Sequence, residues 1–385
     1  MNHLMKKQFV PSNNGNFANY KDVQQLLKLE SDQGEFGQSI KDTVDWIPEG
    51  QKCNIKGSKE LLNLYEDIDA EKMDFVLPLS EIEFVGFYHD NEIILNLDGL
   101  QARGEYSFTS SFLDSLFSLK KFALFCLQNG EKDMLNENIH KLMISQQNER
   151  RQYRVIMNGE DLLLRGLTTT AYKNYDNNIA LYLALQSLHK YSEDNKVNIF
   201  VESGYIADSE LAITFIQKEV IKIDRDTFVE IGIKLTNNEI TEGKLSLEFI
   251  YRVFDSDNNS FKAIGDTVVG IIHTYQVPTI QGKLKGLANL SIYAQETIEH
   301  IQSIKNRKNL DRDQLALIFS RLSRAKSNEI SKQSKERIES LYQQEVVNNT
   351  YSLVELFGKI DALGTSIDEK TFIHLVFNDL IKYSL

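Results

Sequence analysis

Cysteine and proline are scarce in this sequence. Of 385 residues, two are cysteines, Cys53 and Cys126, and four are prolines. The two thiols match no disulfide framework, metal motif or redox motif, which indicates reduced thiols in an intracellular setting. A core of this size needs no disulfide for stability. The rest of the composition is ordinary, with 42% hydrophobic and 25% charged residues, and it excludes collagen-like and wholly disordered chains.

Long hydrophobic runs are also absent. The most apolar stretch, residues 112–127, is interrupted by Asp114, Lys120 and Lys121, so it is too short and too charged to cross a bilayer. Residues 1–16 hold no apolar segment of the kind that a secretory signal peptide needs. We therefore expect a soluble protein in the cytoplasm, with no membrane partner.

Motifs of known catalytic chemistry are missing too. There is no glycine-rich phosphate loop, dinucleotide fingerprint or nucleophile elbow, and no two of the seven histidines have zinc-ligand spacing. We expect no metal, no cofactor and no small-molecule active site. A nuclease or other hydrolase that uses carboxylates such as Asp208, Glu210 and Glu239 is an alternative, although nothing in their spacing singles them out.

Hydrophobic periodicity divides the chain into four regions. Residues 1–72 are predicted to form a loose N-terminal arm and a loop-rich segment, and residues 73–150 a small β-hairpin region plus helices. Strand-like alternation predicts an α+β sheet domain over residues 151–283, with a largely antiparallel sheet. Residues 284–385 have a helical pattern throughout. The predicted fold class is therefore α+β.

Three turn or cap signals are specific enough to interpret. Asn158-Gly159 favours the tight turn of a β-hairpin, and Asp176 is a candidate helix cap. Residues 255–259 place side-chain oxygens at alternating positions, as a calcium loop does, but the glycine and glutamate of an EF-hand are missing. We interpret this segment as the tip of a hairpin, with a metal site as the alternative.

Charge is unevenly distributed. The formal net charge is −12, so the chain as a whole repels polyanions, which argues against a histone-like DNA-coating protein. Between Ser303 and Ile338, however, the sequence contains ten basic residues and only four acidic residues. This basic strip can contact a nucleic-acid backbone. Alternatively, it binds the acidic remainder of the chain or a neighbouring subunit.

A second basic group surrounds the predicted hairpin. Arg154 lies on its first strand and Arg165 on its return strand, and Tyr172 and Lys173 follow. Guanidinium groups beside tyrosines on a sheet face suit backbone contact combined with base stacking. The alternative is that these aromatic side chains pack in the core or at its rim.

Two segments and one dipeptide carry a resemblance. Residues 165–177 are RGLTTTAYKNYDN, residues 230–240 are EIGIKLTNNEI, and residues 251–252 are Tyr-Arg. In this order they resemble a family of uncharacterised proteins carried by phages and plasmids. That family has a Cys-x-Asn-Gly element after its Tyr-Arg pair, whereas this chain has Val-Phe-Asp-Ser at residues 253–256.

The resemblance implies a mobile-element origin and marks recurring positions, although it assigns no activity. Genes of this kind often accompany replication and recombination functions. We expect Asp176 and other polar positions to maintain the fold, and Glu239 to pair with Arg165 or Arg252 across strands. For the two arginines, structural and functional roles both stay open. The recurring positions are Arg165, Tyr172, Asp176, Asn177, Asn237, Glu239, Tyr251 and Arg252.

Together these features predict a phage or plasmid protein that binds single-stranded DNA or RNA in replication or recombination, as a homo-oligomer. The alternative is a protein-interaction factor, such as a host-defence inhibitor or a virion-associated subunit, that binds a host or phage protein and no nucleic acid. The main prediction requires an open positive surface. Its contact residues are Arg154, Arg165, Tyr172, Lys173, Arg252, Arg307, Arg321, Arg324 and Lys335.

Overall fold

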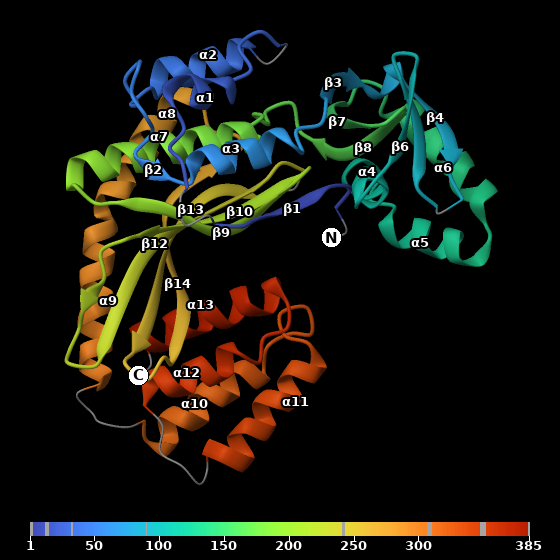
Figure 1. Ribbon diagram of the computed structural model, residues 1–385. Helices are drawn as coiled ribbons and strands as arrows, with labels where there is room; N and C mark the ends of the chain where they lie inside the picture. The colour runs from blue at the N-terminus through green and yellow to red at the C-terminus, as the bar shows by residue number, and fades with distance from the viewer. Residues whose placement is uncertain are drawn as a thin grey trace.

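The fold combines two mostly antiparallel sheets with helices, each sheet having its own hydrophobic core (Figure 1). This arrangement confirms the predicted α+β class. The computed structural model describes residues 3–11, 15–31, 34–89, 91–240, 243–305, 310–346 and 352–383.

The larger sheet has eight strands in the order β1-β9-β10-β12-β13-β14, with β11 beside β12 and β2 beside β9. Only the β2–β9 pair among these is parallel within the described residues. Burial alternates along β12, so the sheet has one core face and one partly solvated face. Its strands are β1 (Lys6–Phe9), β2 (Ile55–Lys56), β9 (Ile199–Ala207), β10 (Glu210–Gln217), β11 (Ile221–Lys222), β12 (Thr227–Asn238), β13 (Lys244–Asp255) and β14 (Ser260–Ile272).

The first strand corrects the expectation of a loose N-terminal arm. Residues 6–9 form β1 and pair antiparallel with residues 204–207 of β9. The polar composition of this segment suggested a loop. An edge strand needs only one neighbour and tolerates exposed polar side chains, so such a composition is compatible with a strand at this position.

The smaller sheet has six strands in the order β3-β7-β8-β6-β5-β4. The hairpin predicted at Asn158-Gly159 is confirmed, with Gly159 at a φ of 65°. It belongs to this sheet, however, because β7 pairs with β3 and β8 with β6. The domain boundary predicted at residue 151 therefore falls inside a sheet. The strands are β3 (Lys72–Pro78), β4 (Ile82–Phe87), β5 (Ile93–Leu97), β6 (Leu100–Gly104), β7 (Arg150–Asn158) and β8 (Asp161–Thr168).

Helices complete each half of the molecule (Figure 1). Helices α4 to α6 lie beside the smaller sheet, and α7 lies with α1 to α3 on the core face of the larger sheet. Within the described residues, no helix combines the length and apolar composition needed to span a bilayer. The helices are α1 (Tyr20–Gln25), α2 (Gly34–Thr43), α3 (Ser58–Glu66), α4 (Phe108–Phe117), α5 (Lys120–Asn129), α6 (Lys132–Ser145), α7 (Asn177–Asn195), α8 (Val277–Leu284), α9 (Leu290–Lys305), α10 (Arg312–Ser323), α11 (Lys332–Leu341), α12 (Leu353–Asp361) and α13 (Ile367–Tyr383), with short turns η1 (Leu79–Glu81), η2 (Lys285–Asn289) and η3 (Tyr342–Val346).

Helix α7 is buried along most of its length, between the larger sheet and the N-terminal helices. Its polar side chains bond to the backbone of the N-terminal segment. The Tyr182 hydroxyl donates to the Val44 carbonyl at 2.6 Å, and Gln186 Oε1 accepts from the N–H groups of Trp46 and Ile47 at 2.7 and 2.8 Å. Buried polar groups need such partners, so these bonds tie the N-terminal layer to the centre of the fold.

The C-terminal region is helical, as its periodicity predicted. Of the helix expected over residues 331–357, α11 continues directly into η3, which ends at Val346, and α12 begins at Leu353, while residues 347–351 lie outside the described residues. Phe261 of β14 contacts Phe357 and Phe377, whose rings stack at 4.1 Å. These aromatic contacts dock α12 and α13 against the larger sheet.

Candidate functional site

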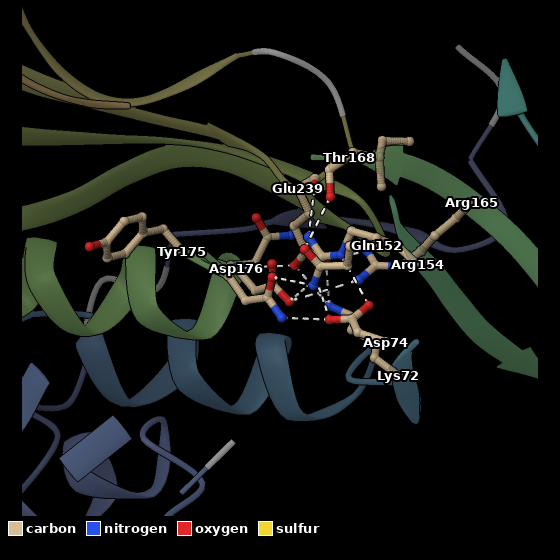
Figure 2. A network of polar contacts seen from close by, with 12 residues as sticks. Lys72, Asp74, Gln152, Arg154, Arg165, Thr168, Tyr175, Asp176 and Glu239 are labelled. Carbon is tan, nitrogen blue, oxygen red and sulfur yellow. Dashed lines mark hydrogen bonds and ion pairs between the residues drawn. The ribbon is translucent and has the colours of Figure 1, made fainter. Parts of the chain in front are cut away.

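A buried cluster of six charged side chains lies where the two sheets meet, and we call it the ionic network (Figure 2). Three are cationic and three are carboxylates, so their formal charges cancel. The four central members are at most 1% exposed. The network consists of Lys72 and Asp74 from β3, Arg154 from β7, Arg165 from β8, Asp176 before α7 and Glu239 after β12.

Arg154 links three segments of the chain. Its Nε and Nη2 atoms donate to the Asp74 carboxylate at 3.1 and 3.2 Å, and Nη2 also donates to Asp176 Oδ2 at 2.6 Å. Its Nη1 atom donates to the Glu239 carbonyl at 2.6 Å. A guanidinium can form several hydrogen bonds at once because its five N–H donors lie in one plane and point in different directions. Arg154 thereby joins the smaller sheet to α7 and to the end of β12.

Glu239 is the second centre of the ionic network. Its carboxylate accepts from Lys72 Nζ at 2.8 and 2.9 Å and from Arg165 Nη1, one of its two predicted partners. The other predicted partner, Arg252, pairs with Glu230 instead. Glu239 Oε1 also accepts from the N–H of Asn177 at 2.8 Å. Glu239 thus caps α7, the role that the sequence assigned to Asp176. Asp176 does occupy the N-cap position, but its side chain turns to Arg154.

The pKa values of both central carboxylates are shifted downward. Burial by itself raises the pKa of Asp176, but the charges of Arg154 and Arg165 outweigh it and hold that pKa below its usual range. For Glu239, burial and the charge of Asp176 raise the pKa, and the charges of Lys72 and Arg165 bring it below its ordinary value. Both groups are therefore carboxylates at neutral pH.

This burial corrects one part of the nucleic-acid prediction. Arg154 and Arg165 are 0% and 1% exposed and paired with carboxylates of the same chain, so they offer no surface to a polynucleotide. Tyr172 donates its hydroxyl to the Glu239 carbonyl at 3.0 Å and stacks on His273 at 4.5 Å. The backbone N–H of Lys173 also bonds to the residue after β14, at the His273 carbonyl.

Six of the eight recurring positions meet in or beside the ionic network. Besides its charged members, Tyr172 contacts Glu239, and Asn237 Nδ2 donates to Asn177 Oδ1 at 3.0 Å. The other two recurring residues, Tyr251 and Arg252, lie elsewhere on β13. Because the six bond chiefly to one another and to backbone, we interpret this part of the pattern as maintenance of the fold.

The carboxylates suggested for a hydrolase also accept hydrogen bonds from groups of the same chain. Asp208 accepts from the Tyr106 hydroxyl and from the N–H of Met5, and Glu210 accepts from the Tyr205 hydroxyl at 2.8 Å. The described residues contain no group of three or more His, Cys, Asp or Glu side chains arranged to hold a metal ion.

The C-terminal basic strip is only partly open. Arg321 and Arg324 are exposed, and Arg321 pairs with Asp379 at 3.1 Å. Lys335 is partly buried and donates its ammonium to the Ala325 carbonyl. Arg307 lies outside the described residues.

A cavity of about 320 Å³ lies between the partly solvated face of the larger sheet and α13, and we call it the sheet–helix pocket. In Figure 1, α13 lies beneath the sheet that contains β9 and β10. None of the described residues that line the cavity is acidic. Its cationic residues are Lys234 of β12, Arg252 of β13, Lys262 of β14 and Lys370 of α13.

Strand register explains why these cations gather. Arg252 lies directly opposite Lys262 on β14, and side chains at alternate positions of a strand share a face. Lys234 reaches the same face from β12. Between these cations lies a small apolar cluster formed by Ile216, Ile250 and Ile264. The sheet–helix pocket therefore combines positive charge with an apolar floor.

The cations of the sheet–helix pocket differ in how they are paired. Arg252 pairs with Glu230 at 2.6 Å and Lys262 with Glu202 at 2.9 Å, and these two cationic side chains remain 36% and 37% exposed. Lys234 and Lys370 form no ion pair with a described carboxylate within 4 Å. Two positive charges are thus left without a close partner in the described part of the chain.

Sequence reasoning singled out two residues of this pocket, Tyr251 and Arg252, and only Arg252 was a candidate contact residue. Lys234 lies on a strand that was expected over residues 228–236, whereas Lys262 precedes the last expected strand, residues 268–275, because β14 begins earlier than its sequence suggested. Nothing in the sequence placed Lys370 with them, because it comes from a helix more than a hundred residues later in the chain. Comparison of the chain with protein-family models, curated proteins and solved structures found no match.

Proposed function

We propose that this chain binds a small organic anion in the sheet–helix pocket. The residues that line the pocket support this proposal. Four of their side chains are cationic, three are isoleucines, and no described lining residue is acidic. Small-molecule sites commonly occupy about 300–1,000 Å³, and this cavity lies within that range. The proposal thus needs no change of the backbone to admit a ligand.

The chemistry of the lining favours a ligand with two parts. The cationic side chains suit a phosphate or carboxylate, and the isoleucines suit an apolar or ring-bearing portion. Lys234 and Lys370 supply charge that no close carboxylate neutralises among the described residues. A nucleoside monophosphate is a suitable probe of this class, and inorganic phosphate tests the charged part alone.

Isothermal titration calorimetry with AMP, inorganic phosphate and succinate tests the proposal. We expect AMP to bind more tightly than phosphate, and Arg252→Ala to weaken AMP binding about tenfold or more, because a hydrogen bond to a charged group contributes about 1.5–3 kcal/mol. Arg150→Ala is the matched control, since Arg150 lies on the smaller sheet. Absence of binding by all three anions contradicts the proposal.

Single-stranded nucleic acid is a second candidate that shares the phosphate chemistry. With Arg154 and Arg165 buried, its support among the described residues comes from Arg252 in the sheet–helix pocket and from the exposed Arg321 and Arg324. A strand bound through several phosphates would release counterions, so its affinity would fall steeply with salt.

Fluorescence anisotropy with a labelled oligonucleotide at low and moderate salt separates the two candidates. Binding that weakens in the double variant Arg321→Ala, Arg324→Ala supports the nucleic-acid candidate. If AMP binds and the oligonucleotide does not bind even at low salt, the small-anion proposal alone remains.

A further inference from the structure

Lys234 differs from the other lysines of the sheet–helix pocket. Lys262 is paired with Glu202, and Lys370 is exposed on α13. Lys234 projects from β12, an interior strand of the sheet, and is only partly exposed. Its ammonium donates to Thr371 Oγ1 at a long distance of 3.3 Å. This amine is therefore held at the pocket wall by a weak bond.

The groups around Lys234 come from both the sheet and α13. Glu248 lies opposite it on β13, and Asp368 is a further acidic neighbour on α13. Burial lowers the pKa of Lys234, and the charges of these two carboxylates restore only part of it. The other charged or titratable groups that line the pocket are Tyr205, Tyr251, Arg252, Lys262, Lys370 and His374, whose ring bonds to Asp361 at 2.7 Å.

We propose that Lys234 forms an imine with a small aldehyde or ketone whose anionic group is held by the other cations of the sheet–helix pocket. This inference rests on the proposed anion binding and adds a covalent step to it. Two features support it: a partly buried amine that forms no ion pair within 4 Å with a described carboxylate, and neighbouring cations that orient an anionic carbonyl compound. Desolvated lysines beside other cations are the usual imine-forming amines of proteins.

The step balances without an oxidant or a reductant. The lone pair of neutral Lys234 Nζ attacks the carbonyl carbon, and the carbonyl oxygen takes up a proton to give a carbinolamine. Loss of the hydroxyl with one proton as water then forms the C=N bond. The net reaction joins amine and carbonyl and releases one water molecule. Thr371 Oγ1, which already contacts Nζ, is placed to position the amine.

Reductive trapping tests this inference directly. The full chain is incubated with pyridoxal 5′-phosphate at pH 7, reduced with borohydride and mapped by peptide mass spectrometry. We expect Lys234 to carry most of the label, and inorganic phosphate to protect it. The labelling of Lys234 should also persist to lower pH than that of the exposed Lys370, because its lowered pKa leaves more neutral amine.

The variant Lys234→Arg keeps the charge but cannot form the adduct, so it should lose the label, whereas the matched variant Lys262→Arg should keep it. The inference is overturned if the label is spread over exposed lysines, or if labelling is unchanged in Lys234→Arg.

If the wild-type protein binds AMP but Lys234 is not trapped, only the imine proposal fails. If neither AMP binding nor trapping occurs, the binding proposal fails with it. Phosphate protection of the wild-type chain supplies a readout that does not depend on how the variants fold.

Discussion

The ionic network and the sheet–helix pocket each hold three or more cationic side chains, but their carboxylates are arranged differently. In the ionic network, three cations meet three carboxylates, and Arg154 and Arg165 are shielded from solvent. In the sheet–helix pocket, Arg252 and Lys262 stay about one third exposed beside an open volume. The same side-chain chemistry joins segments in one region and leaves charge available in the other.

The comparison also teaches what buried charge contributes. Moving ions out of water is costly, and mutual attraction offsets that cost only when every partner is in place. The ionic network spans β3, β7, β8, β12 and the start of α7, so it specifies how the two sheets are joined. Arg252 and Lys262 of the sheet–helix pocket avoid most of this cost, because solvent still reaches their side chains.

The largest expected effect is on Glu239. Glu239→Gln leaves Lys72 and Arg165 without their carboxylate, and breaking a buried pair in this way typically costs about 3–5 kcal/mol in the free energy of unfolding. Glu230→Gln removes the partner of Arg252, a cation that is 36% exposed, and should cost less than about 1 kcal/mol. Urea unfolding measures both. Equal losses in the two variants would erase the distinction between the regions.

The second largest effect is expected from acid, which should lower the stability that the ionic network contributes to the fold. The pKa values of Asp176 and Glu239 are lowered in the folded chain, so the unfolded chain takes up protons first as the pH falls. The stability they contribute is full above their ordinary pKa of about 4 and is lost as the pH falls from there toward the folded values. Urea midpoints from pH 7 to pH 3 should therefore fall less steeply in Asp176→Asn than in the wild-type chain. Identical slopes would contradict this role.

A smaller effect is expected at the edge of the sheet–helix pocket. Lys370 is exposed, so Lys370→Ala should weaken phosphate or AMP binding by at most about fivefold, as expected for a charge that solvent screens. The free energy of unfolding should stay within about 0.5 kcal/mol. Calorimetric titration and urea unfolding of the same preparation check both statements. A large loss of stability would place Lys370 with the structural charges instead.

The smallest effect is expected at the exposed pair between Arg321 and Asp379, whose side chains are 57% and 49% exposed. Arg321→Ala should change the free energy of unfolding by less than about 1 kcal/mol, because surface ion pairs are screened. AMP binding should not change. A marked decrease in oligonucleotide affinity in this variant would instead support a polynucleotide path along α10.

Local sequence signals predicted the local structure well. Asn158-Gly159 turns the β7–β8 hairpin, and in the tip between β13 and β14 Asp255 Oδ1 accepts from the N–H groups of Asp257 and Asn259 at 3.0 and 2.9 Å. Turns depend on a few adjacent residues, so their chemistry is visible without knowledge of the fold. Arg165 was one of the two partners predicted for Glu239, but the pair joins the two sheets and does not cross adjacent strands as expected.

Long-range features escaped prediction. The outer partners of the β7–β8 hairpin lie 80 and 60 residues earlier in the chain at the pairs Asp74–Arg154 and Arg103–Leu163. Periodicity indicates that a strand exists and which of its side chains share a face, but it does not name the neighbouring strand. For this reason the predicted boundary at residue 151 and the loose arm at residues 1–20 both needed correction.

By itself, the sequence determined the α+β class, the turns and the strand-like alternation of the sheet segments. Only the tertiary structure decided which arginines face solvent. Arg154 and Arg252 both lie on strands, yet one is enclosed by segments distant in sequence and the other borders a cavity. Solvent exposure and charge pairing depend on which elements pack together, and that packing minimises the free energy of the whole chain rather than of any segment.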